Sequence, residues 1–314
     1  MIDKNRRKQL GWIVGSEGAP PFYTVSPAGV AIASSGCHVG EVLQGVVAGE
    51  RCLASFTFDA PRTIAMFEPN DSGIVSVHPG SKRKSARAAE EVLARFGPPG
   101  RGGRLGVFGS LHEGIGLGSS SSEIDASSIA TASAVGVTLD AQQRAEIMLT
   151  VDGATDPLML PDHALLYAHR RAATIHDYGR WPSLEVIVVD TAAGTGGVDT
   201  ATFSLPDYTE SELRAFGMLE SLLGHAIADG DVELLGTVAT SSARINQRFL
   251  PKPRFEELVD IGKDHSAAGL VAAHTGTAVG WIFPRIHGRT VGDVAGLLSR
   301  LEALDLPPID RLCK

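Results

Sequence analysis

The sequence predicts an α+β protein of two lobes, and three observations lead to that prediction. The beginning of the chain carries short strand-like apolar runs separated by turn residues. The remainder is dominated by periodic helical segments with a few apolar runs between them. At 314 residues, the chain is also long enough for two lobes of comparable size. A cleft between such lobes is the expected place for a binding site.

Composition and charge exclude several classes of protein. With 43% hydrophobic residues and a formal net charge of −8, the chain fits neither a disordered protein nor one whose main partner is nucleic acid or a phospholipid surface. No apolar run approaches 18 residues, and the first residues lack the apolar core of a secretory signal, so we expect a soluble, cytoplasmic protein. The cysteines Cys37, Cys52 and Cys313 form no C-x-x-C pair and predict neither a disulfide framework nor a zinc site.

The first half of the chain predicts five strands and three helices. Strands are expected at 28–33, 52–58, 64–67 and 74–77, and a further strand at 105–108. A helix over 82–96 should end at Gly97-Pro98, and its basic run Lys82-Arg83-Lys84 is interpreted as a solvated helix face. Small-residue helices are expected over 122–135 and 140–151, the second capped by Asp140.

The second half predicts strands at 164–168 and 184–189 with a polar stretch, 176–182, between them. We place the domain boundary there, giving an N-terminal domain of residues 1–180 and a C-terminal domain of residues 181–314. Helices are expected over 211–228, 232–242, 254–263 and 291–304. Two apolar runs, 269–273 and 278–283, flank the polar segment 274–277.

The segment from Gly114 to Asp125, G-I-G-L-G-S-S-S-S-E-I-D, carries the clearest chemical signal, because it lies between a predicted strand and a predicted helix. Free amides and a positive dipole end at a helix N-terminus can hold a phosphate without any lysine. The serine hydroxyls can cap the helix, bind phosphate oxygens or ligate Mg²⁺. The segment has neither the Walker A nor the Rossmann spacing. A flexible glycine-serine turn with serine caps is the alternative interpretation.

Three segments in order resemble the motifs of the GHMP kinases. Residues 116–121, G-L-G-S-S-S, are similar to the second, phosphate-binding motif P-x-x-x-G-L-G-S-S-A, although His112 stands at the proline position. Residues 40–45, G-E-V-L-Q-G, resemble the first motif, and residues 273–277, A-H-T-G-T, resemble the third. Both have the form found in the L-threonine kinases of cobalamin biosynthesis, as do Thr155-Asp156 and the stretch from Ser242 to Pro253.

The resemblance implies the two-lobed GHMP kinase fold, with an N-terminal ribosomal-S5-like β/α lobe and a C-terminal ferredoxin-like lobe. It also implies transfer of the γ-phosphoryl group of ATP to an alcohol, with ATP and Mg²⁺ required. The residues implied to bind ATP are Gly114, Gly116, Leu117, Gly118, Ser119, Ser120, Ser121 and Ser122. Those implied to bind the acceptor are Glu41, Gln44, His274, Thr275, Gly276 and Thr277.

Asp156 is implied to be the catalytic residue, which orients the acceptor hydroxyl or deprotonates it as a general base. Ser120 is implied to bind Mg²⁺. The subfamily carries Glu three residues before the catalytic Asp, where this chain has Gly153, so the second metal ligand is Asp152, Glu146 or none.

The leading hypothesis is therefore an L-threonine kinase that makes O-phospho-L-threonine, with a small-molecule substrate and a nucleotide as its only expected partners. Glu41 and Asp156 are candidates for the acceptor's ammonium group, and the amides of residues 275–277 for its carboxylate. One rival is phosphorylation of another alcohol, such as homoserine, serine or a specialised-metabolite precursor. A second rival is a catalytically silent ligand-binding protein, and a homodimer is left open.

Simpler interpretations of single residues also stand. Asp156 alone is a turn or helix cap before Pro157, and Glu41 alone is a surface carboxylate at a helix start. His274 alone is a hydrogen-bonded histidine at a strand end.

Overall fold

The protein is represented by a computed structural model that describes residues 13–14, 23–27, 29–109, 111–192 and 207–314. Its strands are β1 (Ile13–Val14), β2 (Tyr23–Val25), β3 (Ala31–Val47), β4 (Glu50–Asn70), β5 (Val75–His78), β6 (Gly102–Gly109), β7 (His163–Ala168), β8 (Ala173–Arg180), β9 (Leu184–Asp190), β10 (Gly269–Ala272), β11 (Ala278–Ile286), β12 (Arg289–Thr290) and β13 (Asp310–Cys313). Its helices are α2 (Arg83–Phe96), α3 (Ser119–Ala134), α4 (Ala141–Asp152), α5 (Glu210–Asp229), α6 (Val232–Asn246), α7 (Phe255–Asp264) and α8 (Val294–Ala303).

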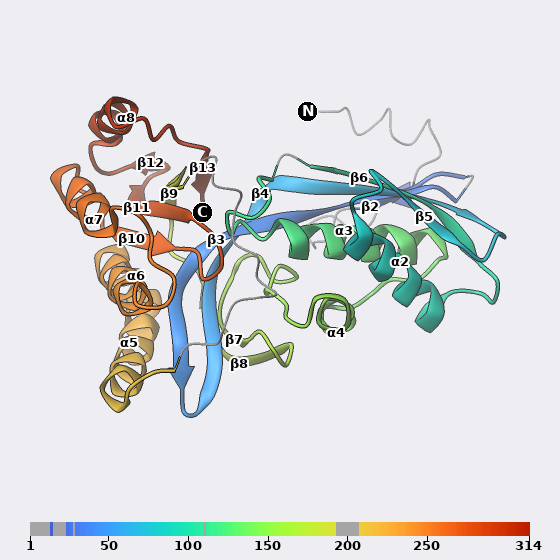
Figure 1. Ribbon diagram of the computed structural model, residues 1–314, viewed down its shortest axis with the longest axis horizontal. Helices are drawn as coiled ribbons and strands as arrows, with labels where there is room; N and C mark the ends of the chain where they lie inside the picture. The colour runs from blue at the N-terminus through green and yellow to red at the C-terminus, as the bar shows by residue number, and fades with distance from the viewer. Residues whose placement is uncertain (1–12, 15–22, 28, 110, 193–206) are drawn as a thin grey trace.

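One mixed sheet runs through both halves of the molecule in the order β13-β9-β11-β10-β3-β4-β6-β5. The two halves meet where β10 pairs with β3 at Ala272 and Glu41. In Figure 1 the long strands β3 and β4 reach from the N-terminal half into the C-terminal half, where they lie beside α5 and α6. The predicted α+β class is confirmed.

The hairpin of β3 and β4 differs from the four separate N-terminal runs that the sequence predicts. Two predicted strands, 52–58 and 64–67, belong to one strand, because the turn-like residues between them form a bulge. Ser35 pairs with Thr63 and Cys37 with Phe58, so four residues of β4 lie opposite one residue of β3. Bulges bend a strand without ending it, and local turn signals do not distinguish the two outcomes.

Helices α2, α3 and α4 cover one face of the N-terminal part of the sheet (Figure 1). α3 packs on β3 and β4, and its buried Ala126 and Ile129 meet Phe67 and Leu105 of the sheet. Asp140 caps α4 as predicted, within a complete capping box that also involves Gln143. This packing fixes the N-terminus of α3 above the middle of β3.

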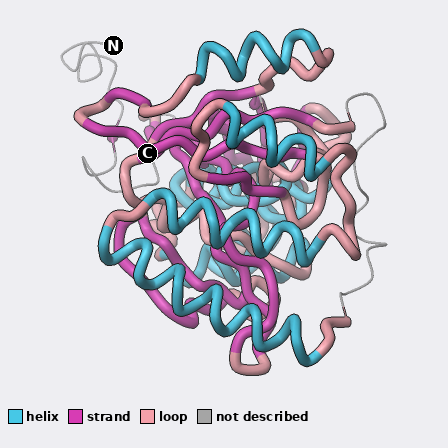
Figure 2. Tube along the Cα trace, turned by 90° about the vertical axis from the view of Figure 1, so that its left-hand side faces the viewer, coloured by secondary structure: helices cyan, strands magenta, loops and turns pink. Residues whose placement is uncertain are grey.

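The C-terminal half has helices on both faces of its strands. Figure 2, which views the molecule from the side of α5–α8, shows these helices in front of the strands. Val186 and Val188 of β9 pack towards α5 and α6, whereas Ile187 and Val189 pack towards α7 and α8. A strand covered on both faces reads as a continuous apolar run, as 186–189 does.

The polar stretch at 176–182 includes residues of a strand that the sequence does not predict. Most of it lies in β8, which pairs with β7 through contacts such as Leu166 with His176. Exposed, polar edge strands are common in sheets because charged residues there prevent aggregation. The domain boundary at residue 180 stays a prediction.

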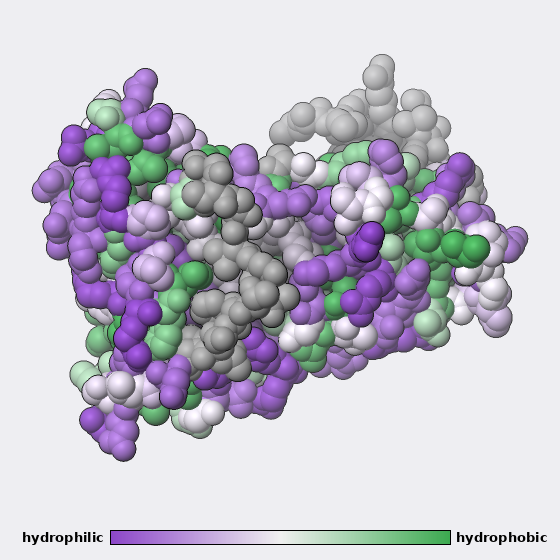
Figure 3. Space-filling model, in the orientation of Figure 1, coloured by the Kyte–Doolittle hydropathy of each residue, from purple (hydrophilic) through white to green (hydrophobic). Residues whose placement is uncertain are grey.

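The surface of the described residues is mixed in polarity. Figure 3 shows hydrophilic side chains over both halves, with hydrophobic ones scattered among them. Among the described residues, no helix combines the length and the apolar character needed to cross a bilayer.

Candidate active site

Bulges in β3 position the first motif. Val39 pairs with Phe56, Glu41 with Ser55 and Leu43 with Ala54, so β3 carries one extra residue on each side of Glu41. Gly40, with φ of 56°, makes this possible. The side chain of Glu41 is only 1% exposed. The simpler interpretation of Glu41 as a surface carboxylate at a helix start is therefore wrong.

Glycines shape the loop that leads into α3. Gly114, Gly116 and Gly118 have φ angles of 78°, 91° and 70°, in the left-handed region that glycine occupies without strain. A Cβ atom on Gly118 would lie 2.3 Å from Cδ2 of His38. The loop therefore lies directly against β3, close to Glu41.

The loop of the third motif is locked to the same glycine loop. Gly276 has φ of 125°, and a Cβ atom there would lie 2.3 Å from the carbonyl of Ile115. The amides of Thr277 and Ala278 both donate to that carbonyl oxygen, at 3.0 and 2.8 Å. A Cβ atom on Gly116 would in turn lie 2.4 Å from the carbonyl oxygen of Thr275. The three segments singled out in the sequence thus meet at one place.

The serine run forms the first turn of α3, three residues earlier than predicted. Ser120 Oγ donates to Asp152 at 2.7 Å, Ser121 Oγ donates to Asp156 at 2.7 Å, and Ser122 Oγ donates to the carbonyl of Ser35 at 3.1 Å. Successive helical residues differ by about 100° in direction, which is why the three hydroxyls reach three different partners.

The first amides of α3 remain available at the same end. The first helical hydrogen bond runs from the amide of Ser122 to Gly118. Within the described residues, no side chain caps the helix and the amides of Ser119, Ser120 and Ser121 have no backbone acceptor. These amides and the positive end of the helix dipole are suited to an anionic group such as a phosphate.

Asp156 is held in a buried acid–histidine pair. Its Oδ2 lies 3.1 Å from Nε2 of His38, and the two residues are 8% and 2% exposed. Burial by itself lowers the pKa of His38, but the charges of Asp156 and Glu41 and the hydrogen bond to Asp156 outweigh it and raise the pKa to about 9. Burial raises the pKa of Asp156, yet His38, His274 and Ser121 together hold it well below its usual range. Asp156 is therefore an ionised hydrogen-bond acceptor.

Glu41 joins the third motif to this pair. The amide of His274 donates to Glu41 Oε2 at 2.6 Å, and His274 Nδ1 lies 2.8 Å from Oε1. The same Oε1 is 3.7 Å from Nδ1 of His38. Burial lowers the pKa of His274, but the charge and hydrogen bond of Glu41 raise it overall. The interpretation of His274 as a hydrogen-bonded histidine after a strand is confirmed, and its partner is a proposed acceptor-binding residue.

The basic run at the start of α2 is not a purely solvated face. Lys84 Nζ lies 2.5 Å from Asp152 Oδ1 and 3.3 Å from Ser120 Oγ. Lys82 Nζ lies 2.5 Å from Glu123 on α3 and also pairs with Glu113. The prediction failed because these contacts join segments about 30 to 70 residues apart and leave no periodic signal.

The predicted metal ligands lie side by side. Ser120 and Asp152 both offer oxygen atoms, the donors that a hard cation such as Mg²⁺ requires. Glu146 is directed elsewhere, to Gln142 at 3.1 Å and Arg95 at 3.7 Å. No group of three or more His, Cys, Asp or Glu side chains able to hold a metal occurs in the part of the chain that the structure describes. A cation held here would need ligands from the nucleotide as well.

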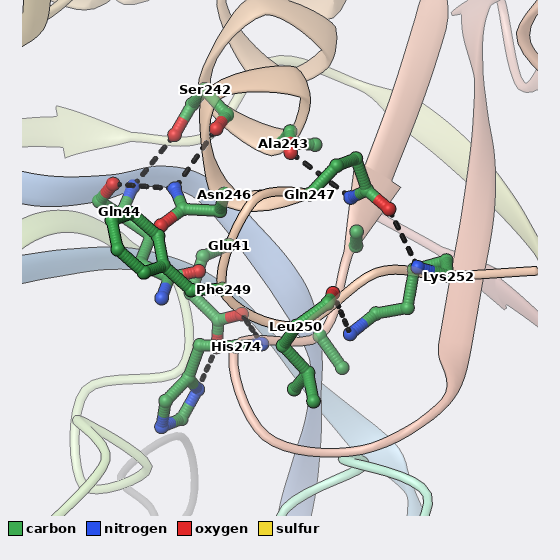
Figure 4. A pocket seen from close by; sticks show the side chains of 12 residues that line it. Glu41, Gln44, Ser242, Ala243, Asn246, Gln247, Phe249, Leu250, Lys252 and His274 are labelled. Atoms are coloured by element: carbon green, nitrogen blue, oxygen red, sulfur yellow. Dashed lines mark hydrogen bonds and ion pairs between the residues drawn. The ribbon is translucent and has the colours of Figure 1, made fainter. Parts of the chain in front are cut away.

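A small pocket lies beside Glu41 and His274, between β3, α6 and the segment that follows α6 (Figure 4). Gln44 lines it, and its backbone is fixed by α6: its amide donates to Ser242 Oγ at 2.9 Å, and Asn246 Nδ2 donates to its carbonyl at 2.9 Å. The Ser242 to Pro253 stretch, noted in the sequence for its resemblance alone, therefore forms one wall of the pocket.

The remaining predicted residues of the third motif lie around the site, but the groups of Thr277 bond to other parts of the protein. Thr277 Oγ1 donates to Asp190 at the end of β9, and its carbonyl accepts a hydrogen bond from Thr191 Oγ1 at 2.7 Å. Its amide donates to the carbonyl oxygen of Ile115. Of the amides proposed for the acceptor's carboxylate, those of Thr275 and Gly276 have no backbone acceptor within the described residues.

Four residues at this site escaped the sequence reasoning: His38, Lys84, His169 and Lys252. His169 lies with its ring 6.1 Å from that of His274, and burial together with that neighbour lowers its pKa to about 4, so it is neutral. His38 lies three residues before Glu41 in a strand whose bulges determine which face each side chain is on, and the sequence does not show these bulges. Of these four, only Lys252 lies in a segment that the sequence analysis singled out, the stretch from Ser242 to Pro253 that resembles the L-threonine kinases.

No protein-family model matches the chain. In sequence it is 27% identical over 276 residues to an L-threonine kinase of Salmonella typhimurium, which covers 87% of this chain and 88% of that protein. It is 24% identical over 259 residues to an L-threonine kinase of Citrobacter freundii, covering 82% and 87%.

Solved structures share the fold. A homoserine kinase of Cytophaga hutchinsonii matches with a TM-score of 0.65 at 14% identity, covering 90% of this chain and 94% of that one. The mevalonate kinase of Methanococcus jannaschii matches with a TM-score of 0.66 at 14% identity, covering 90% and 98%. The resemblance to GHMP kinases, and among them to L-threonine kinases, is thereby confirmed.

Proposed function

Since the chain has the GHMP kinase fold and is similar over most of its length to L-threonine kinases, we propose that it transfers the γ-phosphoryl group of ATP to the hydroxyl of L-threonine. The observation that carries the proposal is the convergence of three segments at Asp156. The glycine loop, bulged β3 and the loop 274–277 bring phosphate-binding amides and an ionised carboxylate together. O-Phospho-L-threonine would then enter cobalamin assembly, as the resemblance implies.

The nucleotide's phosphates would lie at the start of α3. The free amides of Ser119, Ser120 and Ser121 would bind their oxygens, and Lys84 lies near enough to Ser120 to contribute charge. Ser120 and Asp152 would hold Mg²⁺, which neutralises phosphate charge when bound. This arrangement supports both ATP and Mg²⁺ as requirements of the reaction.

Asp156 would accept the hydrogen bond of the acceptor hydroxyl and orient it for in-line attack. Its pKa is too low for a strong base, because His38 and Ser121 stabilise the carboxylate. A loose phosphoryl-transfer transition state demands little proton abstraction before the new bond forms, so an orienting carboxylate is sufficient. His38 is a positioning residue: it holds Asp156 through Nε2 and touches no reacting atom.

The proposal is tested by an ADP-release assay with Mg²⁺ and ATP over L-threonine, L-serine, L-homoserine and amino alcohols, with products identified by mass spectrometry. We expect the highest kcat/KM for L-threonine, and its phosphate ester as product. A higher kcat/KM for another alcohol would assign the reaction to that acceptor. Tight ATP binding without any ADP release would identify a silent ligand-binding protein instead.

A further inference from the structure

The pocket beside Glu41 contains a buried lysine that the mechanism above does not use. Lys252 follows α6, is 4% exposed, and lines the pocket with Glu41, Gln44 and His274. Figure 4 shows its side chain running along the pocket towards Leu250. The only hydrogen bond of its side-chain amine within the described residues is a long one, 3.5 Å from Nζ to the carbonyl oxygen of Leu250.

The charge of Lys252 is poorly compensated by the protein. No carboxylate of the described residues lies within 4.0 Å of Nζ, whereas most of the exposed lysines and arginines that the structure describes have such a partner. Burial lowers the pKa of Lys252 to about 8, and the charge of Glu41 across the pocket works against that shift. The amine is thus still largely protonated at pH 7. A buried, protonated amine without a counter-ion is costly unless a ligand supplies one.

The charges of the pocket match a zwitterion. Glu41 uses two hydrogen bonds from His274, and a carboxylate has room for about four, so it can still accept from an ammonium group. On the other side Lys252 offers three donors and a positive charge. The amides of His274 and Thr277 are already bonded within the protein, whereas those of Thr275 and Gly276 have no backbone acceptor within the described residues. A carboxylate paired with Lys252 can therefore also accept from this loop.

We propose that Lys252 binds the carboxylate of the amino-acid acceptor and so makes the enzyme select amino acids over the corresponding amino alcohols and amides. This inference rests on the proposed function for the identity of the acceptor. It adds a side chain from the opposite wall to the amides of residues 275–277, which are the candidates that the sequence offers for the carboxylate. Lys252 is then a specificity-determining residue, and Glu41 the complementary site for the ammonium group.

The test compares L-threonine with L-threoninamide, which has the same side chain but no carboxylate. Calorimetry measures the Kd of each without ATP, and the ADP-release assay measures KM and kcat. The variants are Lys252→Met, which keeps length and removes charge, Lys252→Arg, which keeps charge, and Lys263→Met as a matched control. Lys263 is an exposed lysine of α7 that pairs with Asp260. Lys252→Met should fold, because it replaces an uncompensated buried charge by an apolar chain.

We expect Lys252→Met to raise the Kd and KM for L-threonine about 10- to 100-fold, the range for a charge-assisted hydrogen bond. The values for L-threoninamide and the Kd for ATP should change less than about threefold, Lys252→Arg should retain part of the preference, and Lys263→Met should behave as wild type. An unchanged ratio of the two Kd values in Lys252→Met would overturn the proposal. A rise in the Kd for ATP instead would also overturn it and assign Lys252 to the phosphates.

The two proposals fail separately. If wild-type protein binds L-threonine better than its amide through Lys252 but never phosphorylates it, the carboxylate site stands and the reaction is wrong. If wild-type protein phosphorylates L-threonine and Lys252→Met keeps the wild-type preference, the reaction stands and the carboxylate site is wrong.

Discussion

Two aspartates near the start of α3 have the same kind of partners but different surroundings. Asp156 binds Ser121 and a histidine, and Asp152 binds the adjacent Ser120 and a lysine. The side chain of Asp156 is 12% exposed, whereas those of Asp152 and Lys84 are 23% and 47% exposed. Asp156 is held by buried partners, whereas the more exposed Asp152 can exchange its lysine contact for a metal ion, which frees Lys84 to pair with a phosphate. Burial thus separates the two proposed roles, orientation of the acceptor by Asp156 and ion binding by Asp152, beside neighbouring serines of one helical turn.

The largest expected effect comes from removing the charge of the buried aspartate. Asp156→Asn should lower kcat by about 10²- to 10⁴-fold, because the acceptor hydroxyl loses its ionised hydrogen-bond partner. The Kd for ATP, measured by calorimetry, should stay within about threefold of wild type. Asp152→Asn is the matched control, and it should alter the Mg²⁺ titration more than kcat. If kcat of Asp156→Asn stays within a few-fold of wild type, positioning by the rest of the site suffices and Asp156 is not catalytic.

A smaller and pH-dependent effect is expected at His38. The folded-state pKa of His38, about 9, lies above its unfolded value, so its contribution to stability is fully present below about pH 6.5 and is lost as the pH rises through about 9. His38→Gln should therefore reduce the free energy of unfolding by about 1–3 kcal/mol at pH 6. The deficit should shrink towards pH 10, as measured by urea unfolding. A deficit that is the same at pH 6 and pH 10 would contradict the charged pair.

The smallest effect is expected at Ser120, beside the more exposed aspartate, Asp152. Ser120→Ala removes one oxygen beside Asp152 and should raise the Mg²⁺ concentration for half-maximal activity by up to about 10-fold. Ser121→Ala, its neighbour, should leave that concentration unchanged and lower kcat instead, because Ser121 donates to Asp156. The measurement is a Mg²⁺ titration of ADP release at saturating ATP. Identical titrations for Ser120→Ala and wild type would remove Ser120 from the metal site.

Local signals in the sequence account for most helices of the fold. Asp140 at the start of α4 and Gly97 after α2 lie where capping rules place them, because a cap depends on residues within one turn. The hairpin of β3 and β4 was divided too early, since whether a turn-like stretch bulges or ends a strand depends on the partner strand. The polar strand β8 was not predicted, because its residues form a strand only through pairing with β7 and carry no apolar pattern of their own.

The candidate site was predictable where its residues lie within motifs, and not where they meet across the fold. The three segments of the resemblance do converge, but their common centre includes His38, which faces Asp156 only because β3 is bulged and α3 packs on it. Lys252 reaches the pocket from a segment more than 200 residues after Glu41. Burial lowers the pKa of Lys252, and the neighbouring carboxylates Asp156 and Glu41 raise that of His38. Both causes arise only in the packed chain.

The double hydrogen bond to the carbonyl of Ile115 has a practical consequence for engineering this protein. Only glycine fits at position 276, because the backbone of Ile115 leaves no room for a side chain there. Chimeras that exchange the 273–277 loop with that of another kinase must therefore carry residues 114–118 along as a matched set. Grafting one segment alone would disrupt its contact with the other. An inactive hybrid of that kind would reflect a misfitted backbone and would say nothing about substrate choice.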